Sequence, residues 1–315
     1  MSATLEKKVE NQLNQSQWLK EWFTPNESHS HRIDHYLVRK KTKYQDAIVA
    51  DSSSFGRCLI LDGEMQSSQF DEFIYHECLV HPALILKDEP KSVLIMGGGE
   101  GATTREILKH KSIEMVTMVD IDGEVIDFCT KHLKTWHQNS FASKKLRLIV
   151  DDAKKFVENT NEKFDVIISD LPSPIEAGPA YLLYTIEFYK TLVQRLSKDG
   201  LFVMQAGSGN LLQIELHQVL YATLKKIFKI VRPFYAYVPS FDVPWAFLIG
   251  SNQKDPMSLT AAQVDKLVRQ RIKGSLQFYD GVTHVGLFHI PKNLRERLEA
   301  EKRVILASKP VYFYK

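Results

Sequence analysis

Cysteine is scarce in this sequence. Cys58, Cys78 and Cys129 are the only three among 315 residues, and no two of them have the CxxC spacing. An odd number of cysteines without that spacing supports neither a disulfide framework nor a structural zinc site. We therefore expect buried, reduced thiols.

A histidine metal motif is also missing. His76-Glu77 and His81 are separated by one residue too many for the HExxH zinc motif. His29, His31 and His35 fall in a polar stretch before the first strands, where we expect ordinary polar side chains. The sequence therefore predicts no bound metal.

Long apolar runs and a charge excess of one sign are absent as well. No run approaches the roughly 20 residues that span a bilayer, and the polar start MSATLEKKVENQLNQ lacks the apolar centre of a signal peptide. The 41 basic and 38 acidic side chains leave a net charge of +3, which argues against a polyanionic partner. We expect a cytoplasmic protein that binds neither nucleic acid nor a membrane.

What the chain does contain is enough apolar material for a large core, with 44% hydrophobic residues over about two ordinary domain lengths. A short helix is expected over Leu5–Trp22, ending at the break Thr24-Pro25-Asn26. Turn signals then separate short strands, which predicts a small antiparallel β region. These strands are Tyr36–Val38, Ala47–Val49 and Cys58–Leu61.

The pattern changes to helical spacing over Phe73–Leu84, and beyond Pro90 short apolar runs alternate with helical segments such as Ala102–His110. This alternation predicts an α/β fold with a parallel, Rossmann-like sheet, covered on both faces. We expect residues 1–89 to form the helix, the small β domain and a linking helix, and residues 90–315 to form the Rossmann-like domain. The expected strands are Val93–Met96, Met115–Val119, Leu146–Val150, Val166–Ile168 and Leu201–Met204; a hairpin of Phe234–Val238 with Ala246–Gly250 and helices at Ala261–Ile272 and Leu294–Lys302 follow.

A glycine-rich turn follows the first of these strands and opens a helix. Its pattern Gly97-x-Gly99-x-x-Ala102, with Gly101 beside it, allows a tight turn and the close approach of a ligand to the backbone. Asp120 stands at the end of the next strand, where a carboxylate binds ribose hydroxyls. The spacing therefore favours an adenosine ligand.

Glu100 inside this turn further restricts the class of ligand that can bind there. A carboxylate there would repel the pyrophosphate of a dinucleotide, whereas a cationic ligand fits. An adenosyl sulfonium compound carries positive charge and has no phosphate. Asp152, after the third strand, is a candidate acceptor for an adenine amino group.

Asp170 ends the fourth strand, at the sheet edge where open α/β sheets bind ligands. An amine nucleophile, with a pKa around 10, must lose a proton before it attacks carbon. We predict that Asp170 accepts that proton while Tyr75 orients the amine. The loop that follows is stiffened by prolines and is expected to cover the site.

Several separated motifs can be compared with those of known families. They are Lys43-Tyr44-Gln45-Asp46, Leu61-Asp62-Gly63-x-x-Gln66, Asp71-Glu72-Phe73-x-Tyr75-His76-Glu77, Gly97 to Gly101, Asp120-Ile121-Asp122, Asp152-Ala153, and Asp170 with Gly178-Pro179. Together they resemble the motifs of the polyamine aminopropyltransferase family, which includes spermidine, spermine and thermospermine synthases. The likeness runs from about Tyr44 to Gly250 and implies a Rossmann-like sheet of the methyltransferase type.

The resemblance implies that decarboxylated S-adenosylmethionine is a co-substrate, that no cofactor is permanently bound, and that an amine displaces methylthioadenosine at the propyl carbon. Putrescine to spermidine is the default reaction, and a homodimer or homotetramer is expected. The loss of the methionine carboxylate also suits Glu100, which would repel intact S-adenosylmethionine. By motif position, the donor contacts are Gln45, Gln66, Gly97, Gly99, Glu100, Gly101, Asp120, Asp152, Ala153 and Pro179, and the polyamine contacts are His76, Glu100 and Asp170.

The acceptor end departs from the family pattern. The loop reads Asp170-Leu171-Pro172-Ser173, where the family usually has a second Asp in place of Ser173, and Glu176 is a candidate replacement for that charge. Glu100, Phe241 and Trp245 resemble thermospermine synthases or agmatine-accepting enzymes, so the loop residues and these aromatic side chains are predicted to contact the acceptor. A methyltransferase that uses intact S-adenosylmethionine, and a catalytically silent polyamine-binding protein, are the alternatives from other classes.

Overall fold

The computed structural model describes residues 17–174, 180–309 and 311. The chain divides into two compact units between Asp71 and Glu72. Helix α2 (Glu72–Leu86), the linking helix, groups with the second unit, because its buried residues from Cys78 to Leu86 share a core with the sheet of that unit.

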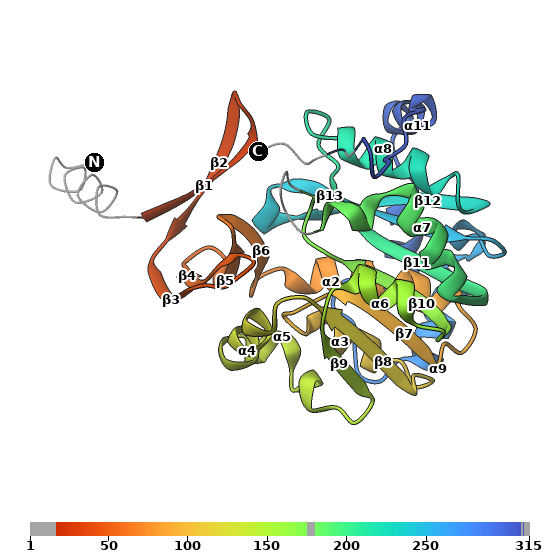
Figure 1. Ribbon diagram of the computed structural model, residues 1–315, viewed down its shortest axis with the longest axis horizontal. Helices are drawn as coiled ribbons and strands as arrows, with labels where there is room; N and C mark the ends of the chain where they lie inside the picture. The colour runs from red at the N-terminus through yellow and green to blue at the C-terminus, as the bar shows by residue number, and fades with distance from the viewer. Residues whose placement is uncertain (1–16, 175–179, 310, 312–315) are drawn as a thin grey trace, which may run out of the picture. The chain divides into compact units, whose positions relative to one another are not determined.

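The first unit consists of antiparallel strands (Figure 1). A hairpin of β1 (Gln17–Thr24) and β2 (Glu27–Ile33) turns at Pro25 and Asn26. A separate sheet has the order β3-β4-β5-β6, which bears out the small antiparallel region. Its strands are β3 (His35–Lys41), β4 (Asp46–Ser52), β5 (Gly56–Leu61) and β6 (Glu64–Ser68).

The helix expected over Leu5–Trp22 is wrong in its last part, because Gln17–Thr24 is a strand. Aromatic residues in this segment, including Trp18 and Trp22, favour a pleated strand, and the backbone pairs with β2 across the proline turn. Local helical spacing was outweighed by this pairing. Residues 5–16 lie outside the described part of the chain.

The second unit contains a seven-stranded sheet in the order β12-β13-β11-β10-β7-β8-β9 (Figure 1). The five strands from β11 to β9 are parallel, and β13 and β12 add an antiparallel hairpin. The expected Rossmann-like sheet and closing hairpin are both confirmed. The strands are β7 (Ser92–Gly97), β8 (Met115–Asp120), β9 (Leu146–Val150), β10 (Phe164–Asp170), β11 (Leu196–Ser208), β12 (Ile230–Val238) and β13 (Val243–Ser251).

Helices cover both faces of this sheet, and the strand residues alternate between them. Leu201 and Val203 pack on the face covered by α2, α3, α9 and α10, whereas Phe202 and Met204 pack on the face covered by α6, α7, α8 and α11. The helices are α3 (Ala102–Leu108), α4 (Gly123–His132), α5 (Lys134–His137), α6 (Ala153–Asn159), α7 (Ile186–Leu192), α8 (Glu215–Leu224), α9 (Ala261–Arg271), α10 (Gly281–Phe288) and α11 (Lys292–Ala300). Short 3-10 turns are Ser140–Ala142, Tyr181–Tyr184 (η2), Val193–Arg195, Pro239–Phe241 (η4) and Pro256–Ser258.

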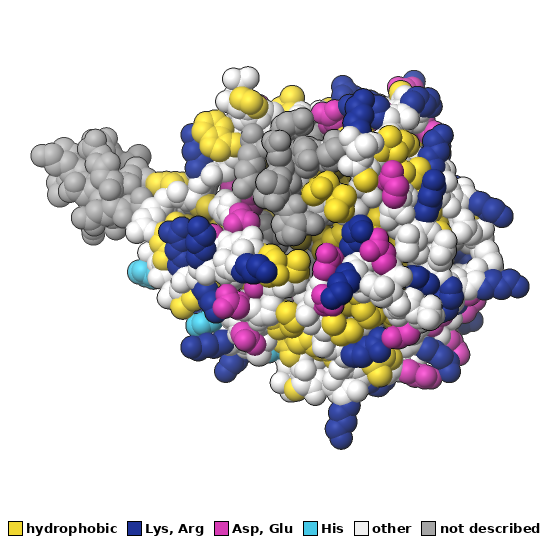
Figure 2. All heavy atoms as spheres, viewed as in Figure 1, with side chains coloured by type: hydrophobic (Ala, Val, Ile, Leu, Met, Phe, Trp, Pro, Cys, Tyr) yellow, Lys and Arg dark blue, Asp and Glu magenta, His cyan; other side chains and the backbone are white. Residues whose placement is uncertain are grey.

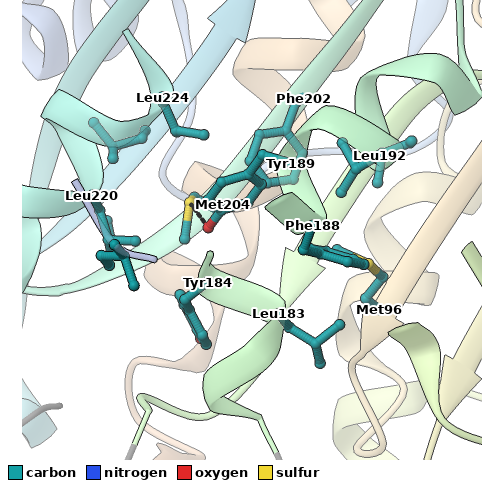
Figure 3. Packing of buried hydrophobic residues seen from close by; sticks show 14 of the residues in the cluster. Met96, Leu183, Tyr184, Phe188, Tyr189, Leu192, Phe202, Met204, Leu220 and Leu224 are labelled. Carbon is teal, nitrogen blue, oxygen red and sulfur yellow. Dashed lines mark hydrogen bonds between the residues drawn. The ribbon is translucent and has the colours of Figure 1, made fainter. Parts of the chain in front are cut away.

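Figure 3 shows the core on the second of these faces. Tyr184 and Tyr189, both fully buried, bring their rings against strand β11, and the Tyr189 hydroxyl contacts Met204 Sδ at 3.6 Å. This packing holds η2 and α7 close to the carboxyl ends of the parallel strands, where the sequence places the candidate site.

The surface agrees with the near balance of charge. On the face shown in Figure 2, Lys and Arg side chains are intermingled with Asp and Glu side chains. Among the helices that the structure describes, none is long and apolar enough to cross a bilayer.

Candidate active site

The glycine turn links β7 to α3 and depends on residues without a Cβ atom. Gly97 has φ +82°, and a Cβ there would lie 2.3 Å from the backbone oxygen of Asp170. Gly101 also has φ +82°, and its Cβ would lie 2.6 Å from the Phe141 ring. The turn is therefore packed against neighbouring elements, and β10 lies directly beside it because Gly97 and Asp170 are paired in register.

Asp120 is positioned at the end of β8, facing the turn. A Cβ on Gly99 would lie 3.0 Å from Asp120 Oδ2, and the backbone N–H of Asp122 donates to Asp120 Oδ1 at 2.9 Å. Burial, together with the negative charges of Asp122 and Asp170, raises the pKa of Asp120 to about 6. Asp122 is the N-cap of α4, where its side chain accepts from the backbone N–H groups of Glu124 and Val125.

Asp152 and Ala153 begin α6 after the third parallel strand. Asp152 is exposed and caps the helix by accepting from the Lys154 N–H at 2.7 Å through Oδ1. Ala153 is buried against the core. Asp152 thus stabilises the start of α6 as its N-cap, and its contact with adenine stays a prediction.

Asp170 accepts hydrogen bonds from two hydroxyl groups. The Tyr75 hydroxyl donates to Oδ1 at 2.7 Å, and the Thr103 hydroxyl donates to Oδ2 at 2.5 Å. Burial raises the pKa of Asp170 above its ordinary value, against the opposing effects of His76, Thr103 and Tyr75. The structure therefore brings together Asp170 and Tyr75, which are 95 positions apart in the sequence.

His76 links two carboxylates. Its Nε2 lies 2.5 Å from Glu100 Oε1, and its Nδ1 lies 2.8 Å from Glu72 Oε2. Although burial opposes the charge of the imidazole, Glu100 and Glu72 raise the pKa of His76 well above its ordinary value. Both imidazole nitrogens face carboxylate oxygens, an arrangement that favours the charged form of His76. Glu100, which the sequence predicts to be an open charge for a cationic ligand, is already shared with a histidine in the structure.

The charge network continues away from the site through Arg105. This side chain, 7% exposed, binds both Glu72 oxygens at 2.8 and 2.9 Å and Glu106 at 2.7 Å. Glu106 in turn lies 3.0 Å from His81. The chain of alternating charges holds Glu72, and through it His76, in one orientation.

Aromatic side chains and the first residues of the loop after β10 also lie near Asp170. The Phe241 ring lies 4.8 Å from Trp245 and 6.2 Å from Tyr75, so these three rings are contiguous. The backbone oxygen of Leu171 accepts from Gln205 at 2.6 Å, and that of Pro172 accepts from the Tyr184 hydroxyl at 2.9 Å. Ser173, the next residue, is partly exposed.

The residues expected at the site fall into three groups, according to where the structure places them. The turn glycines, Glu100, Asp120, Asp170, Tyr75, His76, Phe241 and Trp245 lie in one unit, around the carboxyl ends of the parallel strands. Gln45 and Gln66 belong to the first unit, so their contact with a donor stays a prediction. Pro179 and Glu176 lie outside the described residues, as does most of the loop expected to cover the site.

Sequence reasoning missed the roles of Thr103, Arg105 and Gln205. Thr103 sits in the first turn of α3, where a side chain reaches the neighbouring strand end, so its position two residues after Gly101 was a usable signal. Arg105 and Gln205 had none, because their partners are brought near only by the packing of α2 and of the loop.

Comparisons with known proteins agree with this architecture. Residues 72–260 match the family model described as spermine/spermidine synthase domain, and residues 17–69 match the one described as spermidine synthase tetramerisation domain. A polyamine aminopropyltransferase of Sulfurisphaera tokodaii is 47% identical over 93% of this chain and 97% of its own. One from Sulfolobus acidocaldarius is 46% identical over the same shares.

A solved structure is similar as well. It is described as spermidine synthase in complex with the transition-state analogue AdoDATO, and it is 28% identical with a TM-score of 0.84. The similarity covers 91% of this chain and 96% of that one. Fold, sequence and family models therefore lead to one conclusion: the chain belongs to the spermine/spermidine synthase family of polyamine aminopropyltransferases.

Proposed function

We propose that this enzyme transfers the aminopropyl group of decarboxylated S-adenosylmethionine to a diamine, with putrescine as the default acceptor, spermidine as the product and methylthioadenosine as the leaving group. The observation that carries the proposal is the carboxylate of Asp170, held by Tyr75 and Thr103 at the end of β10, beside the glycine turn.

Asp170 takes the proton in this reaction. The acceptor ammonium loses a proton to the carboxylate, and the freed lone pair attacks the propyl carbon while the carbon–sulfur bond breaks and its electron pair stays on sulfur. Because burial raises the pKa of Asp170, its basicity comes closer to that of the amine than a solvated aspartate's would. Tyr75 and Thr103 fix the carboxylate for an in-line approach.

The donor is proposed to lie along the glycine turn, with its ribose on Asp120 and its adenine near Asp152. Decarboxylated S-adenosylmethionine is cationic at sulfur and at its amine, and Asp120, Asp170 and Glu100 place three carboxyl groups at the site beside the imidazole of His76. This excess of negative charge supports a cationic donor over intact S-adenosylmethionine, whose carboxylate it would repel.

Donor-site affinity is expected to depend on pH. Asp120, with a pKa of about 6, holds its proton below that pH and becomes a full acceptor for two ribose hydroxyls above it. Methylthioadenosine, measured by calorimetry, is therefore expected to bind about tenfold more weakly at pH 5 than at pH 7.5. The Asp120→Asn variant is expected to bind methylthioadenosine weakly at both pH values. If the affinity of that variant changed with pH as much as the affinity of wild type does, Asp120 would not be the titrating group.

Acceptor identity is tested by competition. We expect purified enzyme, given decarboxylated S-adenosylmethionine with putrescine, agmatine, cadaverine and spermidine together, to release methylthioadenosine and to form spermidine as the main product by mass spectrometry. Ser173 replaces an acidic residue, and Phe241 and Trp245 present aromatic faces, so agmatine and spermidine are the competing acceptors. Aminopropylagmatine or thermospermine as the main product would change the acceptor but not the type of reaction.

Other outcomes would overturn the function itself. Methylated amines from intact S-adenosylmethionine would identify a methyltransferase, and amine binding without any methylthioadenosine release would identify a silent binding protein. A reaction without each amine in turn is the control, since transfer requires the acceptor.

Assembly into a homo-oligomer, a dimer or a tetramer, is part of the proposal. Residues 17–69 match a tetramerisation domain. Strand β1 also exposes Trp18 and Trp22 on one of its faces, at 48% and 46%. Large apolar side chains presented together in this way are typical of protein contact surfaces.

A further inference from the structure

The N-terminal hairpin gathers two histidines and a glutamate. Glu21 on β1 is paired directly with His29 on β2, and His31 is paired with Leu19. Because alternate residues of a strand face the same side, Glu21, His29 and His31 all project from one face of the hairpin. Nitrogen and oxygen atoms of the three side chains lie within 4.8 Å of one another.

The distances match a metal coordination sphere. His29 Nε2 lies 3.0 Å and His31 Nε2 lies 3.4 Å from the same glutamate oxygen, Glu21 Oε2. A tetrahedral zinc ion with bonds of about 2.0–2.1 Å holds its ligand atoms about 3.3 Å apart. Each imidazole nitrogen therefore already lies at about the spacing of two zinc ligands from the same carboxylate oxygen.

The surroundings restrict these atoms to one orientation. The Met65 N–H donates to the other glutamate oxygen, Oε1, at 2.8 Å, so that Oε2 remains directed at the imidazoles. The Phe23 ring lies 4.5 Å from His29 and the Phe55 ring 5.1 Å from His31. Apolar walls of this kind limit access of water to a bound ion.

His31 gives a second, independent observation. Its side chain is 7% exposed, and among the described residues its Nε2 is buried without a hydrogen bond of acceptable geometry. A buried imidazole nitrogen whose one polar neighbour is too poorly placed for a good hydrogen bond is costly, and a metal ion would satisfy it.

We propose that Glu21, His29 and His31 form a binding site for a divalent transition-metal ion of the zinc class, with water in the remaining position. Two imidazoles and a carboxylate are suited to Zn²⁺, in contrast to the oxygen-only ligands that Mg²⁺ and Ca²⁺ require. The ion would cross-link β1 and β2 within the first unit. The proposal does not depend on aminopropyl transfer, and it replaces the expectation from the sequence that no metal is bound.

The test uses the full-length protein after removal of metal by a chelator. Titration with Zn²⁺, followed by mass spectrometry of the metal, is expected to give about one ion per chain. Co²⁺ is expected to produce the intense visible absorption of a four-coordinate site. Bound Zn²⁺ is also expected to raise the melting temperature, because it binds only the folded hairpin.

Two variants remove single ligands with little change of shape. His31→Gln and Glu21→Gln are expected to weaken Zn²⁺ binding by about 100-fold or more, since even the loss of an outer-shell partner costs 10–100-fold. The matched control is His35→Gln, which changes an exposed histidine of the same unit and should bind like wild type. The proposal is overturned if wild type takes up no ion, or if a folded ligand variant binds as tightly as the control.

Discussion

Asp170→Asn is expected to reduce kcat for methylthioadenosine release by about 10³-fold while the melting temperature stays the same or rises. Proton transfer by a positioned side chain typically contributes 10²–10⁴-fold, and an amide cannot take the proton from the acceptor ammonium. The amide keeps the size of the carboxylate, and the Tyr75 and Thr103 hydroxyls can rotate to satisfy it. Removing a buried charge also relieves its cost of desolvation.

Steady-state kinetics with saturating donor and acceptor, together with thermal unfolding, separate chemistry from folding in this variant. Asp88→Asn is the control, because it changes a 73% exposed aspartate that pairs with Lys254. Turnover of Asp170→Asn within about threefold of wild type would rule out Asp170 as the proton acceptor.

Arg105→Met is expected to lower the free energy of unfolding by about 3–5 kcal/mol, the usual cost of removing one partner from a buried ion pair. The guanidinium is 7% exposed and bonds to Glu72 and Glu106, which are 11% and 0% exposed. Without it, two buried carboxylates lose their shared cation. Activity is expected to fall as well, because Glu72 would no longer hold His76 in place.

Chemical denaturation at neutral pH measures this loss. Arg303→Met provides the comparison, because Arg303 is 54% exposed and its ion pairs are expected to contribute no more than about 1 kcal/mol. If Arg105→Met unfolds at the same denaturant concentration as Arg303→Met, the buried network does not stabilise the folded protein.

Most of the sheet was predictable because each strand carries its own signal. The runs Val93–Met96 and Val166–Ile168 are short, apolar and separated by helical segments, and burial on both faces requires that pattern. The segment Gln17–Trp22 was misjudged for the opposite reason. Its strand character depends on pairing with β2, which no local spacing reveals.

The candidate site was predictable where chemistry and position coincide. Asp170 and Asp120 end parallel strands, and such ends meet at one edge of the sheet. The sequence predicts that Tyr75 orients the amine, but it does not predict the hydrogen bond from Tyr75 to Asp170. It predicts no role for Thr103 or Arg105. Their partners come from other elements, and only packing sets those distances.

The glycine turn, the strand-end carboxylates and the family motifs are local properties, and so the amino-acid sequence by itself determined the fold class and the kind of chemistry. Tertiary structure decided the electrostatic surroundings of the site and the grouping of distant side chains. Glu100 is shared with His76, and Glu21, His29 and His31 converge on one hairpin face. Burial and electrostatic interaction depend on separations of a few ångströms, which are set only when β-strands pair and helices pack.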